Sequence, residues 1–141
     1  MGAPGRFGHG CCFPPGVPSR LDRAASGKLA EDLACAELDR RGYAILARRY
    51  RTRFGEIDIV SRQRGVLVFV EVRARRAADP GTAAESVTAR KRRRIAAMAL
   101  DYLAWTGALE QPCRFDVVAI DGLGTDRMVL RVIEDAFQVD G

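Results

Sequence analysis

The sequence predicts a single α/β domain in which a mixed β-sheet is flanked by helices. Apolar residues recur at helical spacing in two segments, and branched and aromatic residues gather in five shorter segments. The expected order is helix, three strands, helix, two strands. With 141 residues, 48% of them hydrophobic and 29% charged, the chain has the size and composition of one globular domain.

The first half of the predicted domain is a helix followed by three strands. Within 26–41, apolar residues such as Leu29 and Leu33 recur at helical spacing, and Gly42 stands where a helix commonly ends. The short segment 62–65 ends in glycine and predicts a hairpin between the second and third strands. The three strands are expected at 43–50, 54–61 and 66–74.

The second half is expected to be a loop, a long helix and two strands. Proline and glycine within 76–82 break both regular patterns, which predicts a loop. The helix covers about 88–106, with Ile95 and Tyr102 among its inward residues, and Gly107 ends it. The last two strands are expected at 113–120 and 128–133.

The chain is divided into a leader, 1–22, a folded domain, 23–135, and a C-terminal tail, 136–141. The leader is rich in glycine and proline and lacks the pattern of a secretory signal, so we expect it to be disordered. No apolar run approaches the ~20 residues that a bilayer span needs. The four cysteines do not form the pattern of a disulfide framework. These features predict a cytoplasmic protein that is not bound to a membrane.

The distribution of charged residues and of histidine limits the kinds of partner and of catalytic group that the chain is expected to have. The formal net charge is +5 and the isoelectric point is about 9.4. Cations cluster in 48–53 and 90–94, which indicates a polyanionic partner such as nucleic acid, with a solvated basic face as the alternative. The only histidine is His9, so no histidine-dependent triad is expected in the folded part. The chemistry therefore rests on carboxylates, cations or a metal ion.

Two acidic residues interrupt the apolar pattern of neighbouring strands. Alternation along the third strand places Glu71 on the same face as Phe69, where a carboxylate is costly without a partner. If the hairpin closes with Arg62 opposite Gly65, then Asp58 lies across from Phe69 and diagonal to Glu71. Two inward carboxylates at that separation are able to share a divalent cation.

Several stretches of the sequence together form a family pattern, which runs from about residue 23 to residue 120. They are Gly27 with Ala30-Glu31-Asp32-Leu33-Ala34, Arg41-Gly42-Tyr43, Phe54-Gly55-Glu56-Ile57-Asp58-Ile59, Val68-Phe69-Val70-Glu71-Val72-Arg73-Ala74-Arg75 and Arg114-Phe115-Asp116-Val117-Val118. In these stretches the chain resembles the YraN-like family of predicted endonucleases. That family resembles the Holliday-junction resolvase and PD-(D/E)XK nuclease group, which implies a restriction-endonuclease-like fold.

Carried over by position, the resemblance makes Glu31 the helix carboxylate, and Asp58 and Glu71 the ligands of Mg²⁺ or Mn²⁺. Lys91 matches a lysine that the family tends to keep on its second helix. Arg73 stands where the family usually has a lysine that positions the attacking water and stabilises charge on the phosphate. Arginine is planar but keeps the positive charge and is able to hold a phosphate through two hydrogen bonds. These five residues are the candidate catalytic set.

Each candidate also has a structural interpretation. Glu31 is equally consistent with a surface acid near a helix start, where negative charge is mildly favourable. For Glu71 the alternative to a metal ligand is a structural salt bridge to Arg73 or Arg75. Arginine in place of lysine is consistent with drift that retains the charge.

The expected function is Mg²⁺- or Mn²⁺-dependent hydrolysis of DNA phosphodiester bonds, with branched or structured DNA as one substrate class. The alternative is a noncatalytic nucleic-acid-binding module that retains the nuclease fold. A homodimer through an exposed edge strand is one expected assembly, because junction-cutting relatives are often dimers. Tyr43, Tyr50 and Trp105 are expected to pack rather than to stack on bases. The expected nucleic-acid contacts are Arg51, Arg53, Arg75, Arg90, Lys91, Arg92, Arg93 and Arg94.

Overall fold

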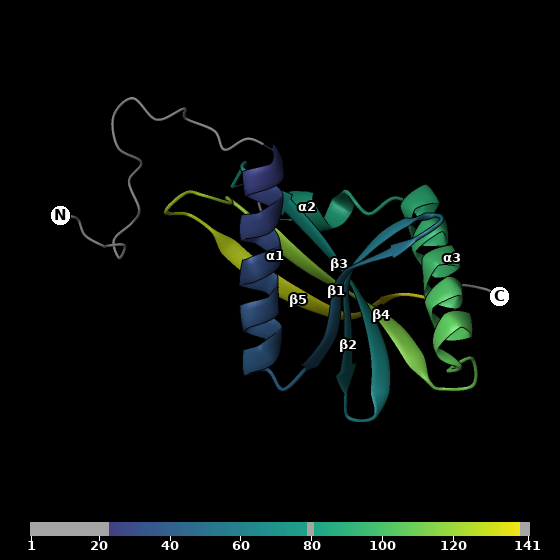
Figure 1. The fold of residues 1–141 in the computed structure, drawn as a ribbon. Helices are drawn as coiled ribbons and strands as arrows, with labels where there is room; N and C mark the ends of the chain where they lie inside the picture. Colours follow the sequence, from purple (N-terminus) through teal and green to yellow (C-terminus); the bar gives the residue numbers. More distant parts are fainter. Residues whose placement is uncertain (1–22, 79–80, 139–141) are drawn as a thin grey trace.

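The computed structural model describes residues 23–78 and 81–138, and the predicted leader, 1–22, lies outside these residues. A five-stranded sheet separates two layers of helix, as Figure 1 shows. This arrangement confirms the predicted α/β class. The elements in chain order are α1 (Arg23–Arg40), β1 (Ala44–Thr52), β2 (Gly55–Gln63), β3 (Val66–Arg75), α2 (Thr82–Glu85), α3 (Ala89–Thr106), β4 (Cys113–Asp121) and β5 (Val129–Phe137).

The sheet is mixed, and its strands follow one another in chain order from β1 to β5. Three neighbouring pairs are antiparallel, while β3 and β4 are parallel because the chain crosses over through α2 and α3 between them. The one-turn helix α2 begins at the end of the predicted loop and was not predicted. None of the helices in the described ranges is both long and apolar enough to span a bilayer.

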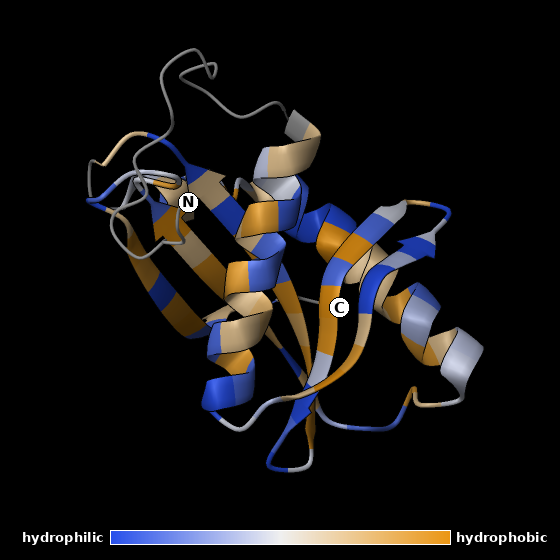
Figure 2. Cartoon of the chain, turned by 60° about the vertical axis from the view of Figure 1, so that its left-hand side comes forward, coloured by the Kyte–Doolittle hydropathy of each residue, from blue (hydrophilic) through white to orange (hydrophobic). Residues whose placement is uncertain are grey.

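Two apolar cores form, one on each face of the sheet. Leu67 and Phe69 of β3 pack toward α3, together with Ile95. Val68 and Val70, the alternate residues of β3, pack toward α1. A central strand that is apolar on both faces is expected where helices cover both sides. Figure 2 shows long apolar stretches on the strands that lie between the two long helices.

The turn between β2 and β3 lies one residue further along the chain than predicted, so each residue of β2 faces a residue of β3 two positions further on. Gln63 pairs with Val66, and the turn consists of Arg64 and Gly65 alone. Both turn residues have positive φ, 53° and 78°, as a type I′ turn requires. The prediction that Asp58 lies across from Phe69 was therefore wrong. Continuing the observed register by one step from the last pair, Ile59 and Val70, brings Asp58 opposite Glu71.

The outer part of the β1–β2 hairpin bends over α3. Ile59 packs in the core on the α1 face, whereas Ile57 packs in the core on the α3 face, although regular alternation would keep them on one side. On the neighbouring strand Arg49 has a left-handed φ of 52°. Asp58 therefore lies at the point where the strands change sides, and the pairing of β2 with β3 ends beside it.

A buried carboxylate holds β4, β5 and the start of β1 together. Asp116 has no exposed surface, and its carboxylate accepts hydrogen bonds from the Tyr43 hydroxyl (2.7 Å), from Arg114 Nε (3.0 Å) and from the backbone N–H of Asp135 (2.9 Å). Asp135 has a left-handed φ of 52° next to an irregularity in the β4–β5 register. β5 continues to Phe137, which is buried, so residues 136 and 137 of the predicted tail belong to this strand.

Candidate functional site

Two carboxylates face each other where β2 and β3 separate. Asp58 Oδ2 accepts a hydrogen bond from the backbone N–H of Val72 at 2.8 Å, so the side chain takes the place of a main-chain partner at the end of the ladder. Glu71, on β3, is 7% exposed. Both acids line the same hollow, and the charge of Glu71 acts on the Asp58 carboxyl. The prediction that both acids turn toward one place is confirmed.

The environment of Asp58 disfavours its negative charge. Burial raises the pKa of the Asp58 carboxyl well above its ordinary value, and the neighbouring charge of Glu71 raises it further. The hydrogen bond from Val72 acts in the opposite direction but does not compensate. Among the described residues, no cation lies within ion-pair distance of Asp58. A carboxylate pair of this kind favours a positive charge placed between its members.

Glu71 is approached by the two cations that the sequence predicted. Lys91 Nζ lies 3.3 Å from Glu71 Oε2, and Arg73 NH1 lies 3.6 Å from the same oxygen. The structural interpretation of Glu71 as the partner of Arg73 is thus correct in part. Both cations are about three quarters buried, because their side chains are 25% and 28% exposed. They line one side of the acid pair.

Arg73 is held in place by a residue that the sequence analysis did not identify. Its Nε donates to Ser86 Oγ at 2.8 Å, and the Ser86 hydroxyl donates to the carbonyl oxygen of Ala83 at 2.6 Å. Ser86 ends the one-turn helix α2. The serine had no signal in the sequence, because it lies in a segment without apolar periodicity between the predicted loop and helix.

Hollows open on both sides of Asp58. The hollow on the α3 side has a volume of about 260 Å³ and is lined by Asp58, Glu71, Arg73, Lys91 and Arg94, among others. The hollow on the α1 side, of about 360 Å³, is also lined by Asp58. The acid pair is therefore accessible to a ligand, and the α3-side hollow is lined by three cations, Arg73, Lys91 and Arg94, as well as by three acids.

Glu31 lies at the α1-side hollow and not against the acid pair. Glu31 is 7% exposed. Its carboxylate accepts hydrogen bonds from Arg48 NH2 at 2.8 Å and from Arg49 Nε at 3.2 Å. Consecutive strand residues reach the same acid because Arg49 has the left-handed φ described above. The structure thus brings Glu31 near Asp58, with which it shares the hollow, but its charge is compensated by arginines.

The predicted nucleic-acid contacts divide into three groups. Arg90, Lys91 and Arg94 line a hollow at the start of α3. Arg51 pairs with Glu56 at 2.9 Å, and Arg53 lies 3.9 Å from Asp101, both near the tip of the β1–β2 hairpin. The remaining three are placed apart: Arg92 over the ring of Phe137, Arg93 exposed on α3, and Arg75 exposed at the end of β3.

The donor set fits a hard cation with few protein ligands. Among the described residues, no group of three or more His, Cys, Asp or Glu side chains is arranged to hold a metal ion. Structural zinc needs such a group, whereas Mg²⁺ keeps several waters and commonly binds through one or two carboxylates. Asp58 and Glu71 are such a pair, and burial, followed by the neighbouring charge of Glu71, raises the pKa of Asp58.

The fold and the site define a class: an α/β protein with a mixed five-stranded sheet and a carboxylate pair where two antiparallel strands separate. The model of the "Uncharacterised protein family UPF0102" matches residues 30–120. The chain belongs to this family. The matched range contains all five residues of the candidate catalytic set.

Similar proteins in bacteria share most of their length with this chain. A UPF0102 protein of Symbiobacterium thermophilum is 47% identical over 111 residues, which are 79% of this chain and 94% of the relative. One of Ralstonia nicotianae is 47% identical over 131 residues, which are 90% and 97% of the two chains. One of Cupriavidus pinatubonensis is 54% identical over 106 residues, which are 74% and 83%. The similarity thus covers at least 74% of this chain and at least 83% of each of these relatives.

Proposed function

We propose that this protein is a Mg²⁺- or Mn²⁺-dependent endonuclease that hydrolyses phosphodiester bonds in DNA. The observation that carries the proposal is the pair formed by Asp58 and Glu71 in a hollow that Arg73 and Lys91 also line. A buried pair of like charges weakens the fold unless it has a ligand. The resemblance to the PD-(D/E)XK nuclease group supports the same conclusion.

In this proposal Asp58 and Glu71 would be the residues that hold the cation. When bound, such an ion would lower the pKa of a bound water and polarise a phosphate oxygen. Hydrolysis adds the oxygen of water to phosphorus and breaks one P–O ester bond, and negative charge develops on the phosphate oxygens. Arg73 and Lys91 stand where they offer hydrogen bonds to those oxygens. The ion pairs with Glu71 orient the side chains of Arg73 and Lys91 before the substrate arrives.

The position of Arg73 is compatible with this role. Its Nε is engaged by Ser86, which leaves the terminal nitrogens of the guanidinium group directed toward the acid pair. A planar guanidinium binds phosphate oxygens through parallel hydrogen bonds, which the point charge of lysine does not. Arg73 therefore supplies the positive charge that the family's usual lysine would supply to the phosphate, but through a planar group with a different geometry.

DNA as the substrate is supported by the cations around the site. Arg90 and Arg94 continue the positive lining of the hollow beyond Lys91. Phosphate contacts of this kind give affinity that decreases steeply with salt concentration. Two further expectations stay predictions: a location in the cytoplasm, and a homodimer formed through one of the edge strands, β1 or β5.

The test combines metal binding with cleavage. Calorimetric titration with Mn²⁺ is expected to show binding by the wild-type protein and none by Asp58→Asn or Glu71→Gln. Cleavage of supercoiled and branched DNA is expected to fall at least about a thousandfold in both variants, because the cation contributes several kcal/mol to the transition state. Asp39→Asn, at an exposed position on α1 away from the site, is the matched control. Cleavage that survives in both site variants contradicts the mechanism.

A noncatalytic DNA-binding module is the second candidate. The observation in its favour is that Glu71 already has two cations beside it, one of which is an arginine in the lysine's place. This candidate predicts DNA binding that weakens with salt but no heat of Mn²⁺ binding and no cleavage. The titration therefore separates the two functions.

A further inference from the structure

Trp105 is the only tryptophan of the chain, and its side chain is not packed in a core. It lies in the last turn of α3 and is 83% exposed. The prediction that it packs was wrong, whereas Tyr43 is buried and Tyr50 packs edge-on against Tyr102, as predicted. A large aromatic residue that is left in water at this degree of exposure points to a ligand or partner.

Trp105 continues a row of residues that begins at the candidate active site. Arg94, Asp101 and Trp105 are spaced by seven and four residues along α3, which places them on one side of the helix. Arg94 also lines the hollow that contains Asp58 and Glu71. Eleven residues of helix separate Arg94 from Trp105, which corresponds to about 16 Å along the helix axis.

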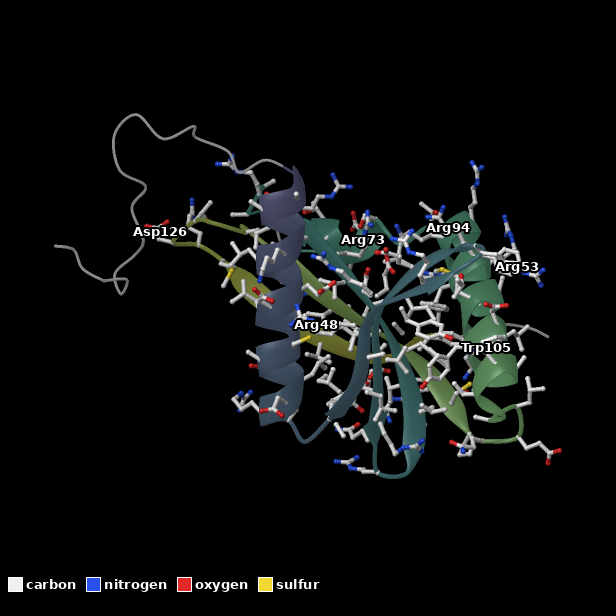
Figure 3. The ribbon with its side chains drawn as sticks, in the orientation of Figure 1. Arg48, Arg53, Arg73, Arg94, Trp105 and Asp126 are labelled. Atoms are coloured by element: carbon white, nitrogen blue, oxygen red, sulfur yellow. The ribbon has the colours of Figure 1, made fainter. Side chains whose placement is uncertain are left out.

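An arginine from the β1–β2 hairpin lies beside Asp101, the middle residue of this row. Arg53, from the tip of the β1–β2 hairpin, lies 3.9 Å from Asp101, and its guanidinium group stacks on the ring of Phe54 at 5.0 Å. Arg53 is 79% exposed as a side chain, and Phe54 is 43% exposed. Figure 3 shows Arg94, Arg53 and Trp105 one after another along α3. The row therefore combines two cations with two exposed aromatic side chains, and its one acid, Asp101, lies beside Arg53.

We propose that this row, made of Arg94, Arg53, Phe54 and Trp105, binds a single-stranded segment of DNA and that a base stacks on Trp105. The proposal rests on the function proposed above and adds the form of the substrate: DNA with an unpaired strand next to the cleavage point. Cations that follow the backbone, with exposed aromatic rings between them, are the usual means of binding single strands. In duplex DNA the faces of the bases are already stacked, so an aromatic ring gains little.

The competing occupant is a second copy of this chain. Leu100, on α3, and Leu109, in the turn that follows α3, are 60% and 59% exposed and would favour such an interface. Two copies that meet here, however, each bring Arg53 and Arg94 but only one acid, Asp101. This excess of positive charge opposes self-association and matches a polyanion.

Because the chain has a single tryptophan, its fluorescence reports directly on this residue. Asp58→Asn protein is titrated with an oligothymidine strand and with a blunt duplex of equal length, in buffer with a chelator so that no cleavage occurs. We expect the oligothymidine strand to quench the emission and the duplex to leave it nearly unchanged. Anisotropy of labelled DNA, measured in parallel, reports binding independently of Trp105.

The variants Trp105→Ala and Trp105→Phe sharpen the test. Trp105 is exposed, so both variants are expected to fold. Affinity for the labelled single strand is expected to fall roughly tenfold in Trp105→Ala and much less in Trp105→Phe, since phenylalanine retains a stacking face. Affinity for the blunt duplex is expected to stay the same in both variants.

Saturating binding of the single strand without quenching overturns the inference, and so does an emission change that depends on protein concentration without DNA, which indicates self-association. Quenching by the single strand, together with no cleavage by the wild-type protein in Mn²⁺, supports the inference and contradicts only the nuclease function. Cleavage by the wild-type protein, together with no change in Trp105 emission when the single strand binds, contradicts the inference and supports the nuclease function.

Discussion

Asp116 and Asp58 are two inward-facing acids on the same sheet, and they have opposite surroundings. Asp116 is fully buried and receives hydrogen bonds from a tyrosine, an arginine and a backbone N–H. Asp58 receives a backbone N–H, lines two hollows and faces the negative charge of Glu71. Burial alone therefore does not distinguish a structural acid from a functional one. The distinction lies in whether the protein itself supplies the compensating charge.

Three changes test this contrast, and the largest effect on stability is expected at Asp116. Asp116→Asn leaves Arg114 without its principal counter-charge in a poorly exposed position and disturbs the contact with Tyr43. We expect the free energy of unfolding to fall by about 3 kcal/mol. Urea denaturation monitored by circular dichroism measures the change, and Asp39→Asn should shift it by less than about 0.5 kcal/mol. A loss of less than about 1 kcal/mol for Asp116→Asn would show that this network is not structural.

A smaller effect, on cleavage, is expected at Ser86. Removing its hydroxyl in Ser86→Ala frees Arg73 Nε, and we expect cleavage to fall roughly tenfold, the value of one hydrogen bond to a charged group. In an Arg73→Lys background the same change should have less than about a twofold effect, because lysine has no Nε to hold. The two effects are compared in a double-mutant cycle. Equal losses in both backgrounds would mean that Ser86 acts only through the stability of α2.

The smallest effect is a gain of stability at Asp58. In a chelator, Asp58→Asn removes the repulsion between Asp58 and Glu71, and we expect the free energy of unfolding to rise by about 1 kcal/mol. The raised pKa of Asp58 means that folding takes up a proton. The wild-type protein should therefore become more stable, relative to Asp58→Asn, as the pH falls through that pKa. Loss of stability in the variant would place Asp58 in the same category as Asp116.

Much of the fold followed from periodicity and turn residues, because these patterns depend on near neighbours in the chain. The order of the long elements and the inward direction of Asp58 and Glu71 were predicted in this way. The hairpin register was not, because the closure was placed at Arg62 and Gly65, whereas Gln63 pairs with Val66 and the turn consists of Arg64 and Gly65. A basic residue with left-handed φ gives no clear signal in a single sequence.

The features of the site that were missed depend on contacts between distant segments. Arg48 and Arg49 both reach Glu31 because of a local change of backbone direction, which no side-chain pattern announces. Ser86 becomes significant only when β3 and α2 lie side by side. Trp105 was expected to pack in the core or at its rim because aromatic residues usually pack, and only the folded structure shows that it is 83% exposed.

The central claim is that Asp58 and Glu71 share a divalent cation. The most direct test is a crystal structure of the protein soaked in Mn²⁺, with data collected at a wavelength where manganese scatters anomalously. The account predicts a single anomalous peak between the two carboxylates, with oxygen distances of about 2.1 to 2.2 Å, and no peak at Asp116. An empty site in which Lys91 or Arg73 has moved between the two acids would contradict it.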